Sequence, residues 1–547
     1  IEASIKIAED LRTKIASPEL RTSYFATVQN YYQFYIYLLM ELHKKQPNSG
    51  YDTKAFEVSE RSHARTLLEL LQEANAHIRE GISPELLQQE QSLQQQLDAI
   101  EKQRIEVISR PNHTHEQQAE LDQKQQTLLG QYQDIQTQIR ATSPRYAALT
   151  QPQPLTLAQI QQQILDPNTI LLQYSLGKER SYLWAVTKTD ITTYELPKAA
   201  DIEEAARNFR NTVTNERYRN NFNKLAETNN AISQMILQPV AAQLGQKRLL
   251  IVGDGVLNYL PFAALSLNDI PGKNGKNPLI FDHEIVLLPS ASTLAILRQN
   301  YNDRQPPSKA LAILADPVFS ANDERVKNNS SAATQQAIES ANLGLSRSSR
   351  DNDIQFKRLN FTRQEAQVIE ALFPANSSSE SFDFDASRAT ATSPNLSQYK
   401  IIHFATHGLV NSVHPELSGI VMSLVDKNGN PLNGFLRLTD IFNLKLSADL
   451  VVLSACQTGL GQNIQGEGMV GLTRGFMYAG AKRVVVSLWS VDDEGTSKLM
   501  ASFYQGMLQK GLTPAAALRA AQLEMWQQEK WRSPYYWAAF TLQGEWR

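Results

Sequence analysis

Two residues in the second half of the chain have the chemistry of a nucleophile and its base. His407 and Gly408 follow the apolar run Ile402 to Thr406, and Cys456 follows the apolar run that ends at Ser454. An imidazole beside a thiol can take its proton, and the thiolate can then attack a carbonyl carbon. Backbone N–H groups of Gly408 and Cys456 are candidates for holding the oxyanion that develops, and Gly408 adds no side chain where the carbonyl must sit.

Cys456 is the only cysteine in the chain. A free cysteine is most often a small buried hydrophobe, which is the structural alternative for Cys456. Its place after an apolar strand, with His407 in the equivalent place after another, favours the reactive interpretation. A single cysteine also excludes an internal disulfide framework and cysteine-based zinc fingers or iron–sulfur clusters.

The elements that must position this pair are strands buried on both faces. The segments 401–406, 450–454 and 483–489 are short continuous apolar runs, which are typical of parallel strands covered by helices. In open α/β sheets, functional residues gather where such strands end. The segments 170–174 and 182–187 predict a hairpin, and one helix is expected from about Glu203 to Leu244.

The first 150 residues predict an all-helical region. Ser17-Pro18-Glu19 is a helix start and Asn48-Ser49-Gly50 is a helix stop. Two Gln-rich segments with heptad spacing follow on either side of Arg110-Pro111, which predicts an antiparallel helical hairpin. The hairpin is interpreted equally well as an arm that binds a partner or as a spacer.

Composition narrows the class of protein. The chain has 547 residues, 42% of them hydrophobic, and a net charge of −3. This charge is not that of a protein that binds nucleic acid through bulk positive charge. No segment has the apolar length of a membrane span, and the N-terminus lacks a signal peptide, so we expect a cytoplasmic protein. Because the chain begins with Ile1, we expect it to be a piece of a longer protein.

Six separated motifs resemble one family in the order in which they occur. They are similar to the CHAT domain, a caspase-like (clan CD) cysteine peptidase module that commonly follows TPR arrays, typically in cyanobacteria and other bacteria. The likeness spans about residues 165–547, and the motifs are Asp254–Phe262, His403–Gly408, Leu453–Gly459, Gly466–Gly468, Ser487–Asp493 and Pro534–Phe540.

The resemblance implies a cysteine endopeptidase with His407 as general base and Cys456 as nucleophile. The roughly 50-residue spacing of the two residues and the sequence Ala-Cys-Gln-Thr-Gly also resemble the caspase pattern. No cofactor is implied. The implied partners are a protein substrate and a regulatory protein bound by the N-terminal helices. The alternative function is a non-catalytic scaffold that binds proteins through a caspase-like fold.

The expected fold is α/β, a mostly parallel caspase-like sheet flanked by helices, preceded by an all-α region. We expect a TPR-like helical region at 1–80 and the helical hairpin at 81–147. A degenerate caspase-like half without catalytic residues is expected at 148–305, and the catalytic half at 306–547.

Substrate preference is predicted from acidic residues. No caspase-type arginine pocket can be placed in the sequence, so specificity for Asp at P1, the residue before the cleaved bond, is not expected. Asp492, Asp493 and Glu467 fall by topology near the P1 pocket, and carboxylates there would favour Arg or Lys. If so, Arg347 and Arg350 in a long polar loop are a possible self-processing site.

Two other patterns were weighed against this function. His403, His407 and Cys456 are candidate zinc ligands, but they lack a fourth ligand, and His403 is better interpreted as a packed core residue. The run Gly466 to Gly471 is a literal G-x-G-x-x-G. It begins too far after its strand to hold a dinucleotide, so NAD binding is not expected.

Overall fold

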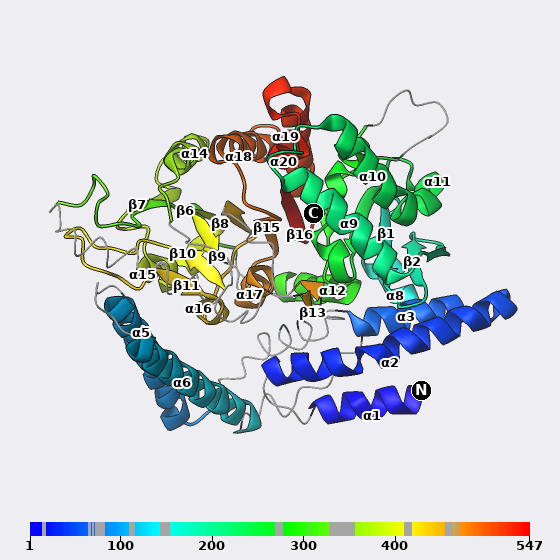
Figure 1. Ribbon diagram of the computed structural model, residues 1–547, viewed down its shortest axis with the longest axis horizontal. Helices are drawn as coiled ribbons and strands as arrows, with labels where there is room; N and C mark the ends of the chain where they lie inside the picture. The colour runs from blue at the N-terminus through cyan, green and yellow to red at the C-terminus, as the bar shows by residue number, and fades with distance from the viewer. Residues whose placement is uncertain are drawn as a thin grey trace.

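A computed structural model gives the architecture of the chain (Figure 1). The structure describes residues 1–13, 18–63, 67, 71, 82–108, 115–142, 154–267, 277–302, 304, 306–327, 356–409, 418–454, 463–464, 468–469 and 471–547.

The N-terminal region is helical, as the sequence predicts. The helices are α1 (Glu2–Thr13), α2 (Pro18–Lys45) and α3 (Tyr51–Ser62), and α2 packs against both of the others. Helix α2 begins at the predicted Pro18. The predicted stop is a 3₁₀ turn (Pro47–Ser49) followed by Gly50 at φ 71°, a left-handed conformation that favours glycine.

Helix α3 attaches this region to the sheet. The side chains of Ser59 and Gln173 are 3.0 Å apart, and a Glu60 carboxylate oxygen accepts a hydrogen bond from the Ser292 N–H at 2.7 Å. Ser59 and Glu60 are fully buried. The polar side of α3 is therefore part of an interior contact.

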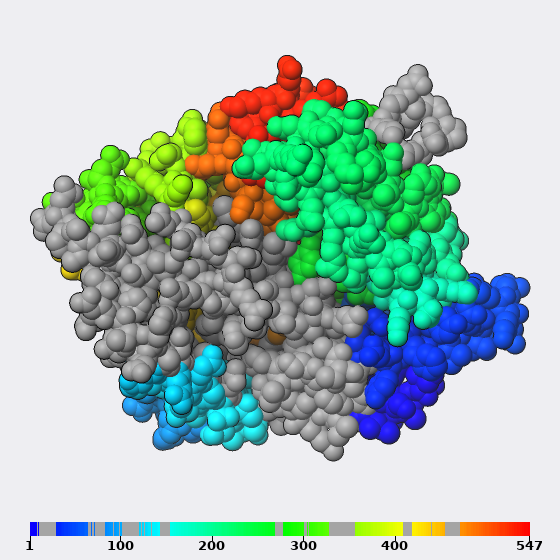
Figure 2. All heavy atoms as spheres, in the orientation of Figure 1, coloured from blue at the N-terminus to red at the C-terminus, as the bar shows by residue number. Residues whose placement is uncertain are grey.

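Helices α5 (Pro84–Ile108) and α6 (His115–Thr142) pack against each other. Ile82, just before α5, clusters with Ile135 and Ile139 near the end of α6, so the two helices run antiparallel, as predicted. Figures 1 and 2 show this pair and α1–α3 along the lower side of the molecule.

One sheet of eleven strands forms the centre of the protein, in the order β3-β2-β1-β4-β5-β16-β15-β12-β8-β6-β7. Its strands are β1 (Thr169–Ser175), β2 (Ser181–Val186), β3 (Ile191–Leu196), β4 (Arg248–Val252), β5 (Ile285–Leu287), β6 (Lys309–Pro317), β7 (Ser378–Asp383), β8 (Tyr399–Ala405), β12 (Leu450–Ser454), β15 (Arg483–Ser487) and β16 (Phe540–Gly544).

Two parallel arrays meet in this sheet. Strands β15, β12, β8, β6 and β7 are parallel to one another and form what we call the second half. Strands β1, β4, β5 and β16 are also mutually parallel and, with β2 and β3, form the first half. Strand β16 is antiparallel to β15, so the carboxyl ends of the two arrays lie at opposite edges of the sheet.

Side chains of the second half alternate between two helical layers. Val452 and Val485 belong to one core cluster, whereas Val451 and Val484 belong to the other. Figure 1 shows α14, α18, α19 and α20 above the strands and α16 and α17 below them. Their bounds are α14 (Asn360–Glu370), α16 (Leu438–Phe442), α17 (Leu472–Ala479), α18 (Asp493–Leu508), α19 (Pro514–Gln527) and α20 (Pro534–Trp537).

The helices of the first half and the remaining short elements complete the two layers. They are α8 (Leu157–Gln163), α9 (Ala199–Thr214), α10 (Phe222–Ile236), η2 (Gln238–Val240), α11 (Ala241–Leu244), η3 (Gly255–Tyr259), η4 (Phe262–Ala264), η5 (Leu279–Phe281), α12 (Ala291–Asn302), α15 (Arg388–Ala391), η6 (Pro394–Gln398) and η8 (Glu529–Trp531).

Two small sheets lie outside the main one. Strands β9 (His407–Leu409), β10 (Gly419–Val421) and β11 (Phe435–Arg437) form an antiparallel sheet. Strands β13 (Asn463–Ile464) and β14 (Gly468–Met469) form a hairpin that contacts η3, and β13 also contacts α2.

The fold class predicted from the sequence is confirmed, but the helix expected from Glu203 to Leu244 is wrong. The structure has α9 and α10 there, separated by a turn, then η2 and α11. The side chain of Asn221 accepts a hydrogen bond from the Lys224 N–H and starts α10 anew. Strand β3 was missed because it is a half-exposed edge strand without an apolar run.

None of the described helices combines the length and apolar character that crossing a bilayer requires.

A substitution at Leu542 tests how much the contact between the two halves stabilises the protein. It is fully buried in β16 and is the register partner of Val485 in β15 and Val286 in β5. We expect Leu542→Ala to lower the free energy of unfolding by about 2–5 kcal/mol, because it leaves a cavity where the halves meet. Urea denaturation measures this. Leu508→Ala, at a position 39% exposed on α18, should change stability by less than about 0.5 kcal/mol, and equal losses would contradict the assignment.

Candidate active site

The carboxyl edge of the second half brings three strand ends together. Ala405, the last residue of β8, is the register partner of Ala315 in β6 and of Ser454, the last residue of β12. The chain therefore leaves β8 and β12 at the same level of the sheet, and β6 continues two residues further to Pro317.

His407 follows the end of β8 by two residues. The fully buried Thr406 turns the chain, and its hydroxyl donates a hydrogen bond to the carbonyl of Val421 at 2.5 Å. His407 then begins β9 and is the register partner of Val421 in β10. His403 and His407 therefore lie in different strands, because β8 ends at Ala405 and β9 belongs to another sheet.

The imidazole of His407 is enclosed and oriented. Its ring lies against Phe319 and Phe356, with centroids 5.1 and 5.4 Å away. Its Nε2 lies 2.7 Å from the carbonyl oxygen of Lys357. A carbonyl only accepts hydrogen bonds, so Nε2 carries the proton and Nδ1 keeps the basic lone pair.

Burial lowers the pKa of His407, and the hydrogen bond to the Lys357 carbonyl opposes this only in part. The ring is therefore neutral at neutral pH, the form in which it can accept a proton. A base whose second nitrogen is held by another group is the arrangement by which nucleophile–base pairs are oriented.

Two residues of the predicted site, Cys456 and Glu467, lie outside the described residues. Gly408, predicted to hold the oxyanion with Cys456, is the middle residue of β9 and the register partner of Ile420. The assignment of the nucleophile and the oxyanion donors stays a prediction.

Asp492 and Asp493, predicted to bind substrate, cap two helices. Asp492 is the N-cap of α18, and its Oδ1 accepts a hydrogen bond from the Gly495 N–H at 2.8 Å. Asp493 Oδ2 accepts one from the Phe361 N–H of α14 at 2.9 Å. Both are half-buried. Desolvation, together with repulsion by neighbouring carboxylates, raises the pKa of Asp493 to about 6.

Sequence reasoning missed a cluster of arginines and aspartates beside His407. The side chain of Asp316, near the end of β6, is 1% exposed and contacts three guanidinium groups. Arg358 donates to both Asp316 carboxylate oxygens at 2.9 and 2.8 Å, and Arg363 Nε donates to Oδ2 at 2.8 Å. Arg325 Nη1 lies 3.1 Å from Oδ1. These residues are far apart in sequence and share no motif.

His403 is the packed, hydrogen-bonded core residue that the sequence favours. Its Nε2 lies 2.8 Å from a Glu365 carboxylate oxygen and its Nδ1 lies 3.0 Å from the Tyr504 hydroxyl. All three side chains are fully buried. Thr362 and Glu365 resemble a capping box in sequence, but α14 begins earlier, at Asn360, with Leu359 as its N-cap, and Glu365 binds His403.

The dinucleotide-like pattern does not have the structure of such a site. Gly468 lies in β14, so a hairpin separates β12 from the next helix, α17, where the dinucleotide motif needs a turn directly after the strand. Gly466, Arg347 and Arg350 lie outside the described residues.

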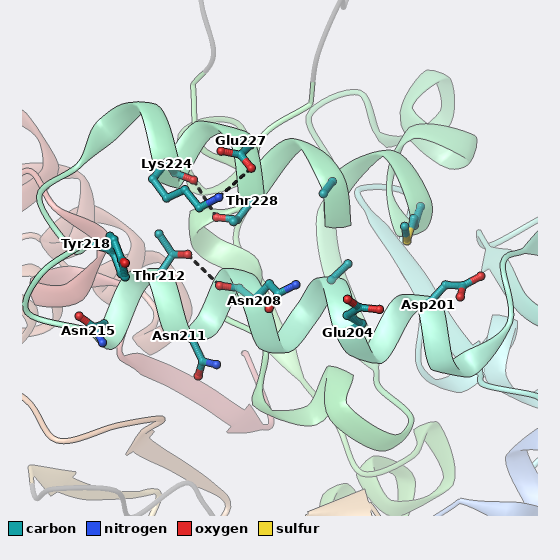
Figure 3. A pocket seen from close by; sticks show the side chains of 13 residues that line it. Asp201, Glu204, Asn208, Asn211, Thr212, Asn215, Tyr218, Lys224, Glu227 and Thr228 are labelled. Carbon is teal, nitrogen blue, oxygen red and sulfur yellow. Dashed lines mark hydrogen bonds and ion pairs between the residues drawn. The ribbon is translucent and has the colours of Figure 1, made fainter.

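A groove of about 670 Å³ lies in the first half, between α9 and α10 (Figure 3). Carboxylates and amides line it, and Lys224 is paired with Glu227 at 2.7 Å within it. Its lining is confined to residues 201–235, so it includes none of the residues around His407.

Comparisons with known proteins were made for the whole chain. The family model of the CHAT domain matches residues 226–545, more than half of the chain. The chain is 30% identical over 184 residues to Tetratricopeptide repeat protein 28 of Mus musculus and 28% identical to that of Homo sapiens. Each match covers 27% of this chain but only 7% of the relative, so the chain spans a small part of the curated relatives' length.

Two solved structures are among those that match this chain. Separase of Saccharomyces cerevisiae, in its complex with securin, gives a TM-score of 0.44 at 9% identity, covering 98% of this chain and 48% of that chain. The Arg-specific cysteine proteinase gingipain R gives a TM-score of 0.38 at 14% identity, covering 58% of this chain and 67% of that chain.

The raised pKa of Asp493 predicts a pH-dependent stability. The fold disfavours the ionised carboxylate, so the stability that the protonated form provides is complete below about pH 4 and is lost as pH rises through 6. Asp493→Asn keeps an acceptor for the Phe361 N–H without the charge. We expect it to stabilise the protein by about 1–3 kcal/mol at pH 7.5 and by almost nothing at pH 4.

Urea denaturation at the two pH values measures this difference. Asp493→Ala is the matched control, because it also removes the charge but leaves the Phe361 N–H without its acceptor, and it should gain less than the Asn variant at pH 7.5. A gain from Asn that is the same at both pH values would contradict the assignment.

Proposed function

Because the chain belongs to the CHAT domain family, we propose that it is a cysteine endopeptidase that cleaves a protein substrate with His407 and Cys456. The observation that carries the proposal is the state of His407, a neutral ring whose Nε2–H is held by the Lys357 carbonyl. A ring held in this way presents Nδ1 as a base.

Chain geometry supports the pairing of the two residues. Ser454 and Ala405 are register partners in neighbouring strands, and such strands lie about 4.8 Å apart. Cys456 follows Ser454 by two positions in the sequence. His407 is two residues beyond Ala405. The proposed nucleophile and base thus each follow, by two positions, a strand that ends at the same edge of the sheet.

The proposed reaction is acyl transfer through the thiol. The Cys456 proton moves to His407 Nδ1, and the thiolate attacks the peptide carbonyl carbon. The N–H groups of Gly408 and Cys456 bind the oxyanion. The imidazolium then gives its proton to the leaving amine, and water, activated by the neutral ring, hydrolyses the thioester and restores the thiol.

The proposed preference is for Arg or Lys at P1, set by Asp492, Asp493 and Glu467. Asp492 and Asp493 each use one carboxylate oxygen as a cap, which leaves the other for a ligand. The desolvated carboxylate of Asp493, with its pKa of about 6, would be stabilised by a bound cation. A basic side chain would therefore gain a charge-assisted hydrogen bond there.

The helical region supports a second candidate, a scaffold that binds proteins without cleaving them. Tyr31, Phe34 and Leu38 follow one another at helical spacing on α2 and are 50%, 57% and 37% exposed. Exposed aromatic residues in a row are typical of protein contacts. In the peptidase proposal, the same face would bind a regulatory protein.

The lone thiol distinguishes these functions. We expect an arginyl peptide ketone to add to wild type, and His407→Ala to slow the addition by at least about 100-fold, because no base then activates the thiol. Intact mass measures the adduct, and iodoacetamide reports whether the thiol is accessible. Labelling by iodoacetamide at equal rates in both proteins, with no ketone adduct, would favour the scaffold.

A peptide library tests the P1 preference. We expect kcat/KM for an Arg peptide to exceed that for its uncharged citrulline analogue, and Asp493→Asn to lower the Arg value by about 10–100-fold, the worth of a charge-assisted hydrogen bond. Asp426→Asn, which removes a carboxylate from an exposed turn, is the control and should change neither value. No preference for basic P1 would remove this part of the proposal.

A further inference from the structure

We propose that Asp316 is a positioning residue for His407, acting through the segment Phe356–Leu359 that it anchors to the end of β6. This inference rests on the proposed function. It assigns to the arginine–aspartate cluster a role in orienting the base.

The segment Phe356–Leu359 carries the carbonyl that holds His407, yet it belongs to neither a helix nor a strand. Its position therefore depends on side-chain contacts. The ring of Phe356 lies against His407 and, at 6.1 and 6.3 Å between centroids, against Phe319 and Phe435. The other tie is Arg358, the residue next to Lys357, which holds Asp316 with two hydrogen bonds.

The surroundings of Asp316 fix its two hydrogen bonds to Arg358 in place. Its backbone has φ 49°, a left-handed conformation that Asp adopts more readily than most residues other than glycine. Its carboxylate is almost fully buried and contacts the guanidinium groups of Arg325, Arg358 and Arg363. A buried carboxylate with several charge-assisted contacts fixes those groups firmly.

The three arginines differ in what else holds them. Arg325 and Arg363 also bind Asp383, through Oδ1 at 2.8 and 2.5 Å. Arg358 has as its other charged partner Glu324, whose side chain is 81% exposed and is therefore a weak tie. Removing the Asp316 charge thus releases Arg358 more than the other two arginines.

The far end of the segment is fixed independently. Helix α14 begins at Asn360, and its Glu365 is bound to His403 of β8. Asp316 on β6 and His403 on β8 therefore hold the chain that follows Lys357 at two points, and β6 and β8 are paired in register. The carbonyl and His407 are placed by the same two strands.

The position of the Lys357 carbonyl affects how readily His407 takes the proton of the Cys456 thiol. With the Lys357 carbonyl in place, the imidazolium that forms when Cys456 loses its proton keeps an acceptor at Nε2. That acceptor stabilises the thiolate–imidazolium pair and lowers the pKa of the thiol. If the segment moves, the thiol should return toward its ordinary pKa of about 8.5.

The test is the pH dependence of alkylation of the single cysteine by iodoacetamide in the intact chain. Wild type should show an inflection well below pH 8.5, and His407→Ala an inflection near 8.5. Asp316→Asn should shift the inflection upward by at least about one pH unit, so that alkylation at pH 6 slows about tenfold. Asp383→Asn, in the same cluster but without contact to Arg358, should stay within about 0.3 units of wild type.

A second variant and a second readout test the same positioning role independently. Arg358→Gln breaks the same tie while leaving Asp316 two arginines, so it should reproduce the shift even if Asp316→Asn fails to fold. Nitrogen-15 NMR of labelled histidine in a Cys456→Ala background, where no thiolate can protonate the ring, reads the His407 tautomer directly, and adding either substitution should change it from Nε2–H to a mixture. This readout serves equally if iodoacetamide does not reach the thiol.

The outcomes separate the two proposals. If wild type and His407→Ala both titrate near pH 8.5, the dyad itself is wrong, and the inference that rests on it falls too. If wild type titrates low but Asp316→Asn and Arg358→Gln leave both the inflection and the tautomer unchanged, the positioning role alone is wrong. An equal shift in Asp383→Asn would also overturn it, because the cluster would then act only as general support.

Discussion

The antiparallel pairing of β15 with β16 is the constraint on which the architecture depends. Parallel strands gather their carboxyl ends at one edge, and this single reversal sends the ends of the two halves to opposite edges of one sheet. At one edge, α3 covers the first half through Ser59 and Glu60. At the other edge, β8 and β12 deliver the candidate site. This one reversal thus places the contact with the N-terminal helices at one edge of the sheet and the candidate site at the other edge.

The buried strands of the second half are predictable because a strand covered on both faces has an almost continuous run of apolar residues. Strands β8, β12 and β15 lie between two helical layers, so each is a short apolar run that the sequence identifies. Strand β3 has no such pattern, since an edge strand that is half-exposed needs none. The sequence does not predict the turn between α9 and α10, because its polar residues are as common on the surface of a helix as at a helix cap.

The candidate site is predictable only in part, for a different reason. His407 stands out because it follows a strand and a glycine follows it. Its orienting group is a main-chain carbonyl, and any residue type at position 357 would supply one. Asp316, Arg358 and Arg363 meet only because β6, the chain before α14 and α14 itself converge in space. Glu365 shows the same effect, since its partner is His403, which is 38 residues away in the sequence.

The position of β16 also has a consequence for the order of events during synthesis. It lies between β5 and β15, but the ribosome makes it after every other strand of the sheet. Until it emerges, the nascent chain carries two unfinished arrays, each with an open edge that can pair with another chain. The pairing of Leu542 with Val286 joins residues 542 − 286 = 256 positions apart, and a contact this non-local is expected to form late. The complete sheet can therefore form only after translation has passed residue 544.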